Sequence, residues 1–328
     1  MSRSYRWIPV TGLLVAVLGL APTTTENGYR IVARLPSIMD GRPLGVPRFD
    51  PTSHRLFAGS VDGLYSADLS AAVPKLIGPL AGTPAMHAIE VAPDLSRVFY
   101  TRLNEIGYID ENGGRPVKIS TLQGSELVYE PTRHEVYTAT EFNGSPYIVV
   151  FDAQTGQLQT TVKLSTGAPF GFQAIPGSVF FFIDGQEGIY AIDANTHEVA
   201  PWRVTGSLVT PGTLEADPSG RYLFLARSRE IDAIDVATRT VMGRVSMYGT
   251  ASLAFDPSSG VLIAAWPEMS EQRDRLAVLR PTADGLTEVG TLKNDAGGTR
   301  IVRTNYGFVQ RADKEFLIWS AQAPTTRH

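Results

Sequence analysis

Polar side chains recur at one position of the sequence, three residues before a series of regularly spaced prolines. The prolines are Pro51, Pro93, Pro131, Pro176, Pro218 and Pro257. The residues three positions earlier are Arg48, Glu90, Val128, Gln173, Glu215 and Ala254, of which four are polar. Carboxylates near arginines can hold a polar ligand or take part in proton transfer. We therefore treat the four polar residues as candidate ligand-binding groups, provided that the fold brings them together.

A few other residues extend this candidate site, but they do not form a metal site. His87 and Glu126 lie near the same positions, and Arg300 or Arg303 is the equivalent in the C-terminal repeat, where the register is lost. Residues three apart on a strand point to opposite faces, so His87 and Glu90 cannot bind one ion. The remaining internal histidines fall in predicted turns, where we expect them to be solvated: His54, His134 and His197. With no cysteine in the chain, we predict no metal and no cofactor.

The elements that must position these residues follow from a second periodic feature. Asp110, Asp152, Asp193 and Asp235 lie 41 or 42 residues apart, each after a short apolar run. The prolines and aspartates both mark tight turns, so each repeat reads as four short strands. We expect these four aspartates to be structural, each accepting backbone N–H groups in its turn. A four-stranded antiparallel unit repeated about every 40 residues predicts an all-β fold, the β-propeller.

The number of blades follows from the two ends of the periodic region. The prolines mark six units, and residues 298–321 supply three more strands without a fourth. Residues 28–38 form a lone strand before the first proline turn. If this N-terminal strand completes the last blade, the ring closes with seven four-stranded blades, which protects the sheet edges. A six-bladed ring with an extra strand is the alternative.

The repeats resemble those of the YVTN-repeat β-propellers, in the superfamily of the quinoprotein amine dehydrogenase β-chain. The resemblance rests on "FDPTSHRLFAG", "VVFDAQTGQLQTTVKL" and "ADPSGRYLFLA", and covers about residues 28–321. Arg280 and Trp319 stand where the pattern has Asp, and "IPGSV" lacks its acidic residue. The resemblance implies the fold more strongly than an activity, because the matched residues are scaffold residues. The wider group includes propeller chains of periplasmic redox enzymes, lactonase-like enzymes and members without assigned chemistry.

The N-terminus predicts export. Residues 1–21 have a basic start at Arg3 and Arg6, an apolar run from Trp7 to Leu20, and small residues after it. This order is typical of a secretory signal peptide, and the apolar run is short for a membrane span. We expect a signal peptide (1–21), a linker (22–27), the propeller (28–321) and a tail (322–328) in a secreted or periplasmic protein. The mature protein would then have no membrane span.

Three functions remain open at the level of the sequence. The formal net charge of −4 argues against nucleic acid as a partner. No nucleophile elbow, phosphate-binding glycine loop or dinucleotide fingerprint is present in the chain. The main hypothesis is a propeller that binds a small molecule or a protein as a scaffold. The alternatives are an enzyme acting at the channel mouth, either a lactonase-like hydrolase or a cyclase or isomerase, and an accessory chain of a periplasmic redox enzyme.

Overall fold

The computed structural model describes residues 29–39, 42–165, 167–204, 212–247, 249, 251–268, 273–283, 285–292, 300–304, 307–312 and 315–321. The predicted signal peptide (1–21), linker (22–27) and tail (322–328) lie outside the described residues. Within the described part, no helix is long and apolar enough to cross a membrane.

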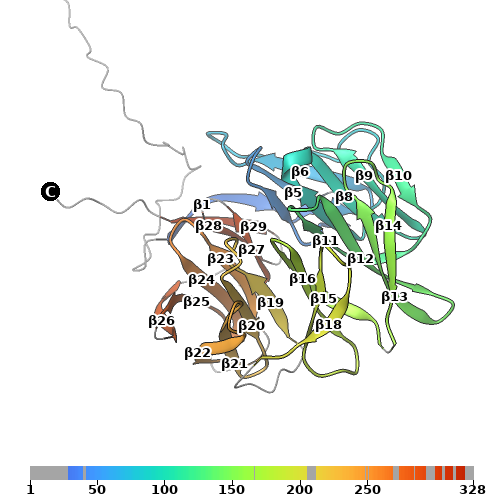
Figure 1. Ribbon diagram of the computed structural model, residues 1–328. Coiled ribbons are helices and arrows are strands. Elements are labelled where there is room, and N and C mark those ends of the chain that lie inside the picture. Colours follow the sequence, from blue (N-terminus) through green and yellow to red (C-terminus); the bar gives the residue numbers. More distant parts are fainter. Residues whose placement is uncertain are drawn as a thin grey trace, which may run out of the picture.

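Seven antiparallel sheets are arranged as blades around a central axis (Figure 1). From the inner strand outward, blade 1 contains β4 (Arg48–Asp50), β5 (Arg55–Ser60) and β6 (Gly63–Asp68). Blade 2 contains β7 (Ala88–Ala92), β8 (Arg97–Arg102), β9 (Glu105–Asp110) and β10 (Val117–Ser120). Blade 3 contains β11 (Gly124–Glu130), β12 (Glu135–Phe142), β13 (Ser145–Asp152) and β14 (Leu158–Lys163). Blade 4 contains β15 (Pro169–Ile175), β16 (Ser178–Ile183), β17 (Ile189–Asp193) and β18 (Val199–Trp202). Blade 5 contains β19 (Thr213–Ala216), β20 (Tyr222–Ala226), β21 (Glu230–Asp235) and β22 (Thr240–Ser246). Blade 6 contains β23 (Ser252–Asp256), β24 (Val261–Glu268), β25 (Arg273–Thr282) and β26 (Gly285–Leu292). Blade 7 contains β27 (Arg300–Thr304), β28 (Gly307–Arg311), β29 (Glu315–Ala321) and, as its outer strand, β1 (Tyr29–Pro36).

Two small departures accompany this regular pattern. In blade 1 the fourth strand is reduced to a single bridge between Ser66 and Ile77. A two-stranded sheet of β2 (Ile38–Met39) and β3 (Arg42–Pro43) lies in the connection from β1 to β4. Among the described residues, the one helical segment is a 3-10 turn, η1 (Pro93–Leu95).

The N-terminal strand closes the ring, as the sequence predicts. Strand β1 pairs antiparallel with β29, from Tyr29 opposite Ala321 to Pro36 opposite Glu315. Figure 1 shows blue β1 beside the strands of the C-terminal blade. Neighbouring inner strands contact each other around the ring, including β27 against β4. The predicted seven-bladed propeller is therefore confirmed.

The core is divided into seven apolar clusters, one between each pair of neighbouring blades. The middle strands are covered on both faces, which explains why they read as continuous apolar runs rather than as alternating patterns. All five residues of β20 are buried. The outer strand β14 alternates between exposed and half-buried side chains. Burial of this continuous apolar surface is the main source of stability.

The turns confirm most of the predicted roles of the periodic residues. The inner strands lead directly into the proline turns, for example β7 into Pro93 and β15 into Pro176. Asp152 Oδ1 accepts the backbone N–H groups of Gln154 (2.9 Å) and Thr155 (2.7 Å). In the same way, Asp193 accepts the backbone N–H groups of Asn195 and Thr196, and Asp235 accepts that of Thr238. The backbone N–H groups of Thr196 and Asn195 hold the pKa of Asp193 below its usual value.

Asp110 does not follow this pattern. No side-chain hydrogen bond from Asp110 is present within the described residues, and its turn is closed by the Gly113 N–H donating to the Asp110 carbonyl at 2.8 Å. Gly113 and Gly114 both adopt positive φ, at 84° and 124°. The turns at Asp152, Asp193 and Asp235 are also closed by a bond to the Asp carbonyl, but from a residue one position later, so the shorter turn with its two glycines is what sets Asp110 apart. The structural prediction is wrong for Asp110.

The expectation of solvated turn histidines is wrong for His197, whose side chain is 19% exposed, whereas that of His134 is 38% exposed; both contact a carboxylate. His134 Nδ1 lies 2.7 Å from Asp94 Oδ2, on the neighbouring blade. His197 Nε2 lies 3.1 Å from the buried Glu135, whose carboxylate also accepts the Tyr137 hydroxyl. Both histidines are in turns with positive φ, as expected for tight connections. They connect neighbouring blades through carboxylates.

Candidate functional site

All seven inner strands line a central cavity of about 680 Å³. Six of the eight predicted site residues lie on its wall: Arg48, Glu90, Glu126, Gln173, Glu215 and Arg303. The ring places the same repeat position of each blade near the common axis, which brings together residues far apart in the sequence. The sequence therefore located the channel-lining position correctly.

The other two predicted residues differ from these six. His87 lies just before β7 and borders a smaller pocket at one end of the channel. Arg300 begins β27, but its side chain lies outside the described part of the structure. Of the two arginines, Arg303 is the one that lines the cavity.

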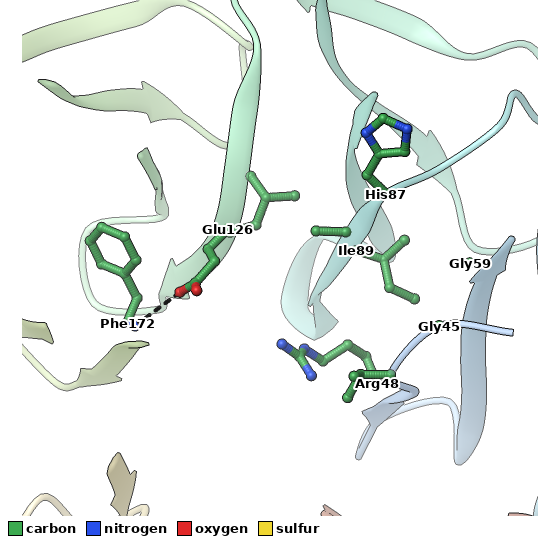
Figure 2. A pocket seen from close by; sticks show the side chains of 10 residues that line it. Gly45, Arg48, Gly59, His87, Ile89, Glu126 and Phe172 are labelled. Atoms are coloured by element: carbon green, nitrogen blue, oxygen red, sulfur yellow. Dashed lines mark hydrogen bonds between the residues drawn. The ribbon is translucent and has the colours of Figure 1, made fainter. Parts of the chain in front are cut away.

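The smaller pocket, which we call the mouth pocket, has a volume of about 330 Å³ and is bordered by blades 1 to 4. It lies where the inner strands begin. Its wall is formed by Gly45, Val46, Arg48, Gly59, His87, Ala88, Ile89, Glu126, Leu127 and Phe172. Figure 2 shows Glu126 and Phe172 on one wall, and Arg48 and Ile89 on the facing wall.

An ion pair joins two of the predicted residues across blades 1 and 2. Arg48 Nε lies 2.8 Å from Glu90 Oε2, and both side chains are partly buried. The Arg48 Nη1 group also donates to the Pro47 carbonyl at 3.4 Å. Because each charge neutralises the other, this pair contributes no net charge to the channel wall.

Glu126 is held differently. Its Oε2 accepts the backbone N–H groups of Gly171 (2.8 Å) and Phe172 (3.4 Å) on blade 4. Gly171 has a φ of 66°, a conformation that glycine adopts without strain and that directs these N–H groups at the carboxylate. Within the described residues, no Arg, Lys or His lies within ion-pair distance of Glu126. Its negative charge therefore remains uncompensated by a cation there.

Glu215 lies deeper in the channel, on β19. Burial raises the pKa of the Glu215 carboxyl, an effect opposed by the nearby charge of Arg303. Its Oε1 accepts the Phe255 backbone N–H at 3.1 Å. Gln173 donates from Nε2 to the Ala174 carbonyl at 3.4 Å. These side chains connect one blade to the next or return to the main chain.

The channel wall combines separately held carboxylates with other polar groups. Glu90, Glu126 and Glu215 are each held by a separate partner, and none is paired with another carboxyl in the way of a proton-transfer dyad. The described residues contain no group of three or more His, Asp or Glu side chains able to hold a metal ion. The channel thus offers polar groups of both signs on a rigid wall.

The sequence reasoning missed a second feature of the same face. Val61, Leu103 and Phe142 lie at the tip of the hairpin between the second and third strands of blades 1, 2 and 3. They are 64%, 65% and 56% exposed. Antiparallel pairing places these tips beside the starts of the inner strands, as the 2.8 Å bond from His87 N to the Thr101 carbonyl shows for blade 2. We call this side of the ring the mouth face.

A signal for these tips is present in the sequence. "VDG" (61–63), "LNE" (103–105) and "FNG" (142–144) each place one apolar residue before Asp or Asn at the same repeat position. Asn104 and Asn143 adopt positive φ in these tight turns. A large apolar residue in such a turn has no core to enter, so its exposure follows from its position in the repeat.

The comparisons with known proteins bear on the fold. No family model and no curated protein matches the sequence. Among solved structures, the chain is similar to a chain of a Mitotic Checkpoint Complex, with a TM-score of 0.69 and 12% identity over 97% of this chain and 99% of that one. It is also similar to the Cps50 (Swd1) beta-propeller domain of Myceliophteria thermophila, with a TM-score of 0.65 and 16% identity over 89% of this chain and 99% of that one. At these identities the likeness establishes the propeller fold alone.

Proposed function

We propose that this protein is a non-catalytic scaffold propeller that binds another protein on its mouth face. The observation that carries the proposal is the row of exposed apolar tips, Val61, Leu103 and Phe142, on three successive blades. Single exposed apolar residues are ordinary, whereas apolar residues grouped around a concavity are typical of protein interfaces. The tips belong to blades 1 to 3, which also form most of the mouth pocket.

The other blades provide a contrast on the same face. The corresponding turn of blade 4 contains Asp184 and Glu187, and that of blade 5 contains Ser228 and Arg229. The apolar tips are thus confined to blades 1 to 3 among the turns that the structure describes. This asymmetry is expected of a docking surface and not of a uniform solvent-exposed rim.

Location and family remain part of the proposal. The basic and apolar N-terminal segment supports export to the periplasm or the medium, and the proline and aspartate repeats support kinship with the YVTN-repeat propellers. Mass spectrometry of the mature protein would test export. A mature chain that still begins at Met1 would contradict it.

The test of binding compares two triple variants of the purified protein. Val61→Ser, Leu103→Ser and Phe142→Ser remove the apolar tips. The matched control replaces the exposed apolar residues Ile77, Val117 and Leu158, which lie on the outer edges of the same blades, by Ser. Each variant is used to capture proteins from an extract of the source cells, and the captured proteins are identified by mass spectrometry.

We expect the wild type and the edge variant to capture the same partner, and the tip variant to lose it. Both variants should retain the wild-type melting temperature, because the replaced side chains are exposed. If the tip variant captures the partner as efficiently as the wild type, the mouth face is not the docking surface.

A further inference from the structure

The mouth pocket combines apolar walls with one carboxylate. Ile89, Leu127 and Phe172 form most of the apolar lining. Gly45 and Gly59 leave part of the wall without side chains; a Cβ on Gly59 would lie 3.1 Å from Ile89 and 3.2 Å from Met86. The pocket therefore owes part of its depth to residues that cannot be enlarged without displacing a neighbour.

The charge balance of this pocket is negative. Arg48 and Glu90 neutralise each other at 2.8 Å, which leaves His87 and Glu126 as the other titratable groups on the wall, and of these Glu126 carries the formal charge at pH 7. Backbone N–H groups hold Glu126 Oε2 in place, so the side chain is positioned before any ligand arrives. A positioned, half-buried carboxylate beside apolar walls is complementary to a cation at the end of an apolar stem.

We propose that the mouth pocket binds the side chain of a lysine or arginine from the partner protein. The methylene stem lies against Leu127 and Phe172, and the ammonium or guanidinium group donates to Glu126. The proposal rests on the proposed function, since the side chain belongs to the protein that docks on the tips of blades 1 to 3. It adds that the partner presents a basic residue among apolar ones.

An anionic ligand fits the same pocket less well. Arg48 is the arginine on the pocket wall, and its Nε donates to Glu90 while its Nη1 donates to the Pro47 carbonyl. The remaining Arg48 N–H groups could reach an anion, but Glu90 already neutralises the charge of Arg48, and the anion would face the Glu126 carboxylate across the pocket. Both effects oppose anion binding.

The test uses defined probes and the full-length protein. n-Butylguanidine reproduces the end of an arginine side chain, n-butanol is its neutral counterpart, and the blocked peptide acetyl-Ala-Arg-Ala-amide presents the same group on a main chain. Binding is measured by calorimetry or by NMR titration. We expect butylguanidine and the peptide to bind at least about tenfold more tightly than butanol, because a charge-assisted hydrogen bond forms only with the cation.

Two variants locate the site. Glu126→Gln removes the charge but keeps an oxygen that can accept the Gly171 N–H, so the fold is retained, and binding of both cations should weaken about tenfold or more. Glu141→Gln removes an exposed carboxylate near the end of β12 on the same face, outside the pocket, and should bind as the wild type does. Circular dichroism and the melting temperature check that both variants are folded.

The outcomes separate this proposal from the proposed function. Equal binding of butylguanidine and butanol, or unchanged binding by Glu126→Gln, would overturn the cation pocket. Binding of butylguanidine without binding of the peptide would also overturn it, since the pocket would then take a free small molecule and not a protein side chain. If the tip variant still captures the partner while the pocket binds the peptide, the docking surface is wrong and the cation pocket stands.

Discussion

Replacing Glu111 by glutamine should stabilise the protein at neutral and alkaline pH. Glu111 follows β9 in blade 2 and is only 3% exposed. Its carboxyl shares a hydrogen bond with the buried carboxyl of Asp50 at the end of β4, and its Oε1 is buried without a hydrogen-bond partner among the described residues. The Arg55 guanidinium from blade 1 donates to the Glu111 carbonyl at 2.7 Å, which fixes the main chain at this point.

The size of the effect follows from the pKa. Burial, reinforced by the Asp50 carboxylate, raises the pKa of Glu111 from 4.5 to about 7. Between these two pH values the folded protein keeps a proton that the unfolded chain has lost, so the free energy of unfolding falls as the pH rises. Each pKa unit corresponds to about 1.4 kcal/mol, so the loss is about 3 kcal/mol and is complete above about pH 7. Glutamine resembles the protonated acid and does not titrate.

The assay is urea denaturation at about pH 5 and about pH 8, with the midpoint and slope fitted for each protein. Wild type and Glu111→Gln should be similar at the lower pH, and the variant should be more stable at the higher pH by up to about 3 kcal/mol. The control Glu198→Gln removes an exposed carboxylate and should follow the wild-type pH dependence. The buried carboxyl pair does not act in this way if Glu111→Gln is no more stable than the wild type at about pH 8 and its free energy of unfolding falls between the two pH values as much as that of the wild type.

Three further predictions concern the turns and the closure of the ring. Asp152→Ala should lower the free energy of unfolding by about 1 kcal/mol because it removes the bonds to the turn, whereas Asp110→Ala should change it by less than about 0.5 kcal/mol; chemical denaturation compares the two, and equal losses would contradict the assignment. Tyr29→Phe removes a hydroxyl that donates to the buried Asp256 and should cost about 2 kcal/mol, measured in the same way; a neutral change would show that the hydroxyl is dispensable. Deleting residues 22–40 should replace the single sharp melting transition by a broader one at lower temperature, since β29 would lose its partner; calorimetry in which the truncated chain melts as sharply and as high as the full chain would refute closure by β1.

Much of the fold could be predicted because a propeller converts sequence period into spatial position. In five of the six repeats marked by a proline, the residue three positions before it lines the channel, so Arg48, Glu90, Gln173 and Glu215 share one wall without any contact being known in advance; the exception is Ala254, which is buried in the core. The unpaired strand at residues 28–38 was equally informative, because an open sheet edge requires a partner. Periodicity thus predicted both the ring and the channel lining.

Contacts between blades were not predictable in the same way. His197 binds Glu135, which lies 62 residues earlier in the sequence, and nothing local in the turn at His197 indicates a carboxylate beside it. Asp110 fails for the opposite reason, because a local glycine pair closes its turn without the side chain. The mouth pocket depends on where side chains are missing, at Gly45 and Gly59, and on a phenylalanine from a distant blade.

The pairing of β1 with β29 also determines how the ring responds to mechanical force. Tyr29 lies opposite Ala321 at one end of the pair, and Pro36 lies opposite Glu315 at the other. A pull applied through the two ends of the chain therefore acts at Tyr29 and Ala321, on the same end of an antiparallel ladder. The hydrogen bonds then carry the load one after another, as in the opening of a zipper, and not all together as in shear. The propeller should open at this joint at low force, releasing the N-terminal strand before any other blade is disturbed.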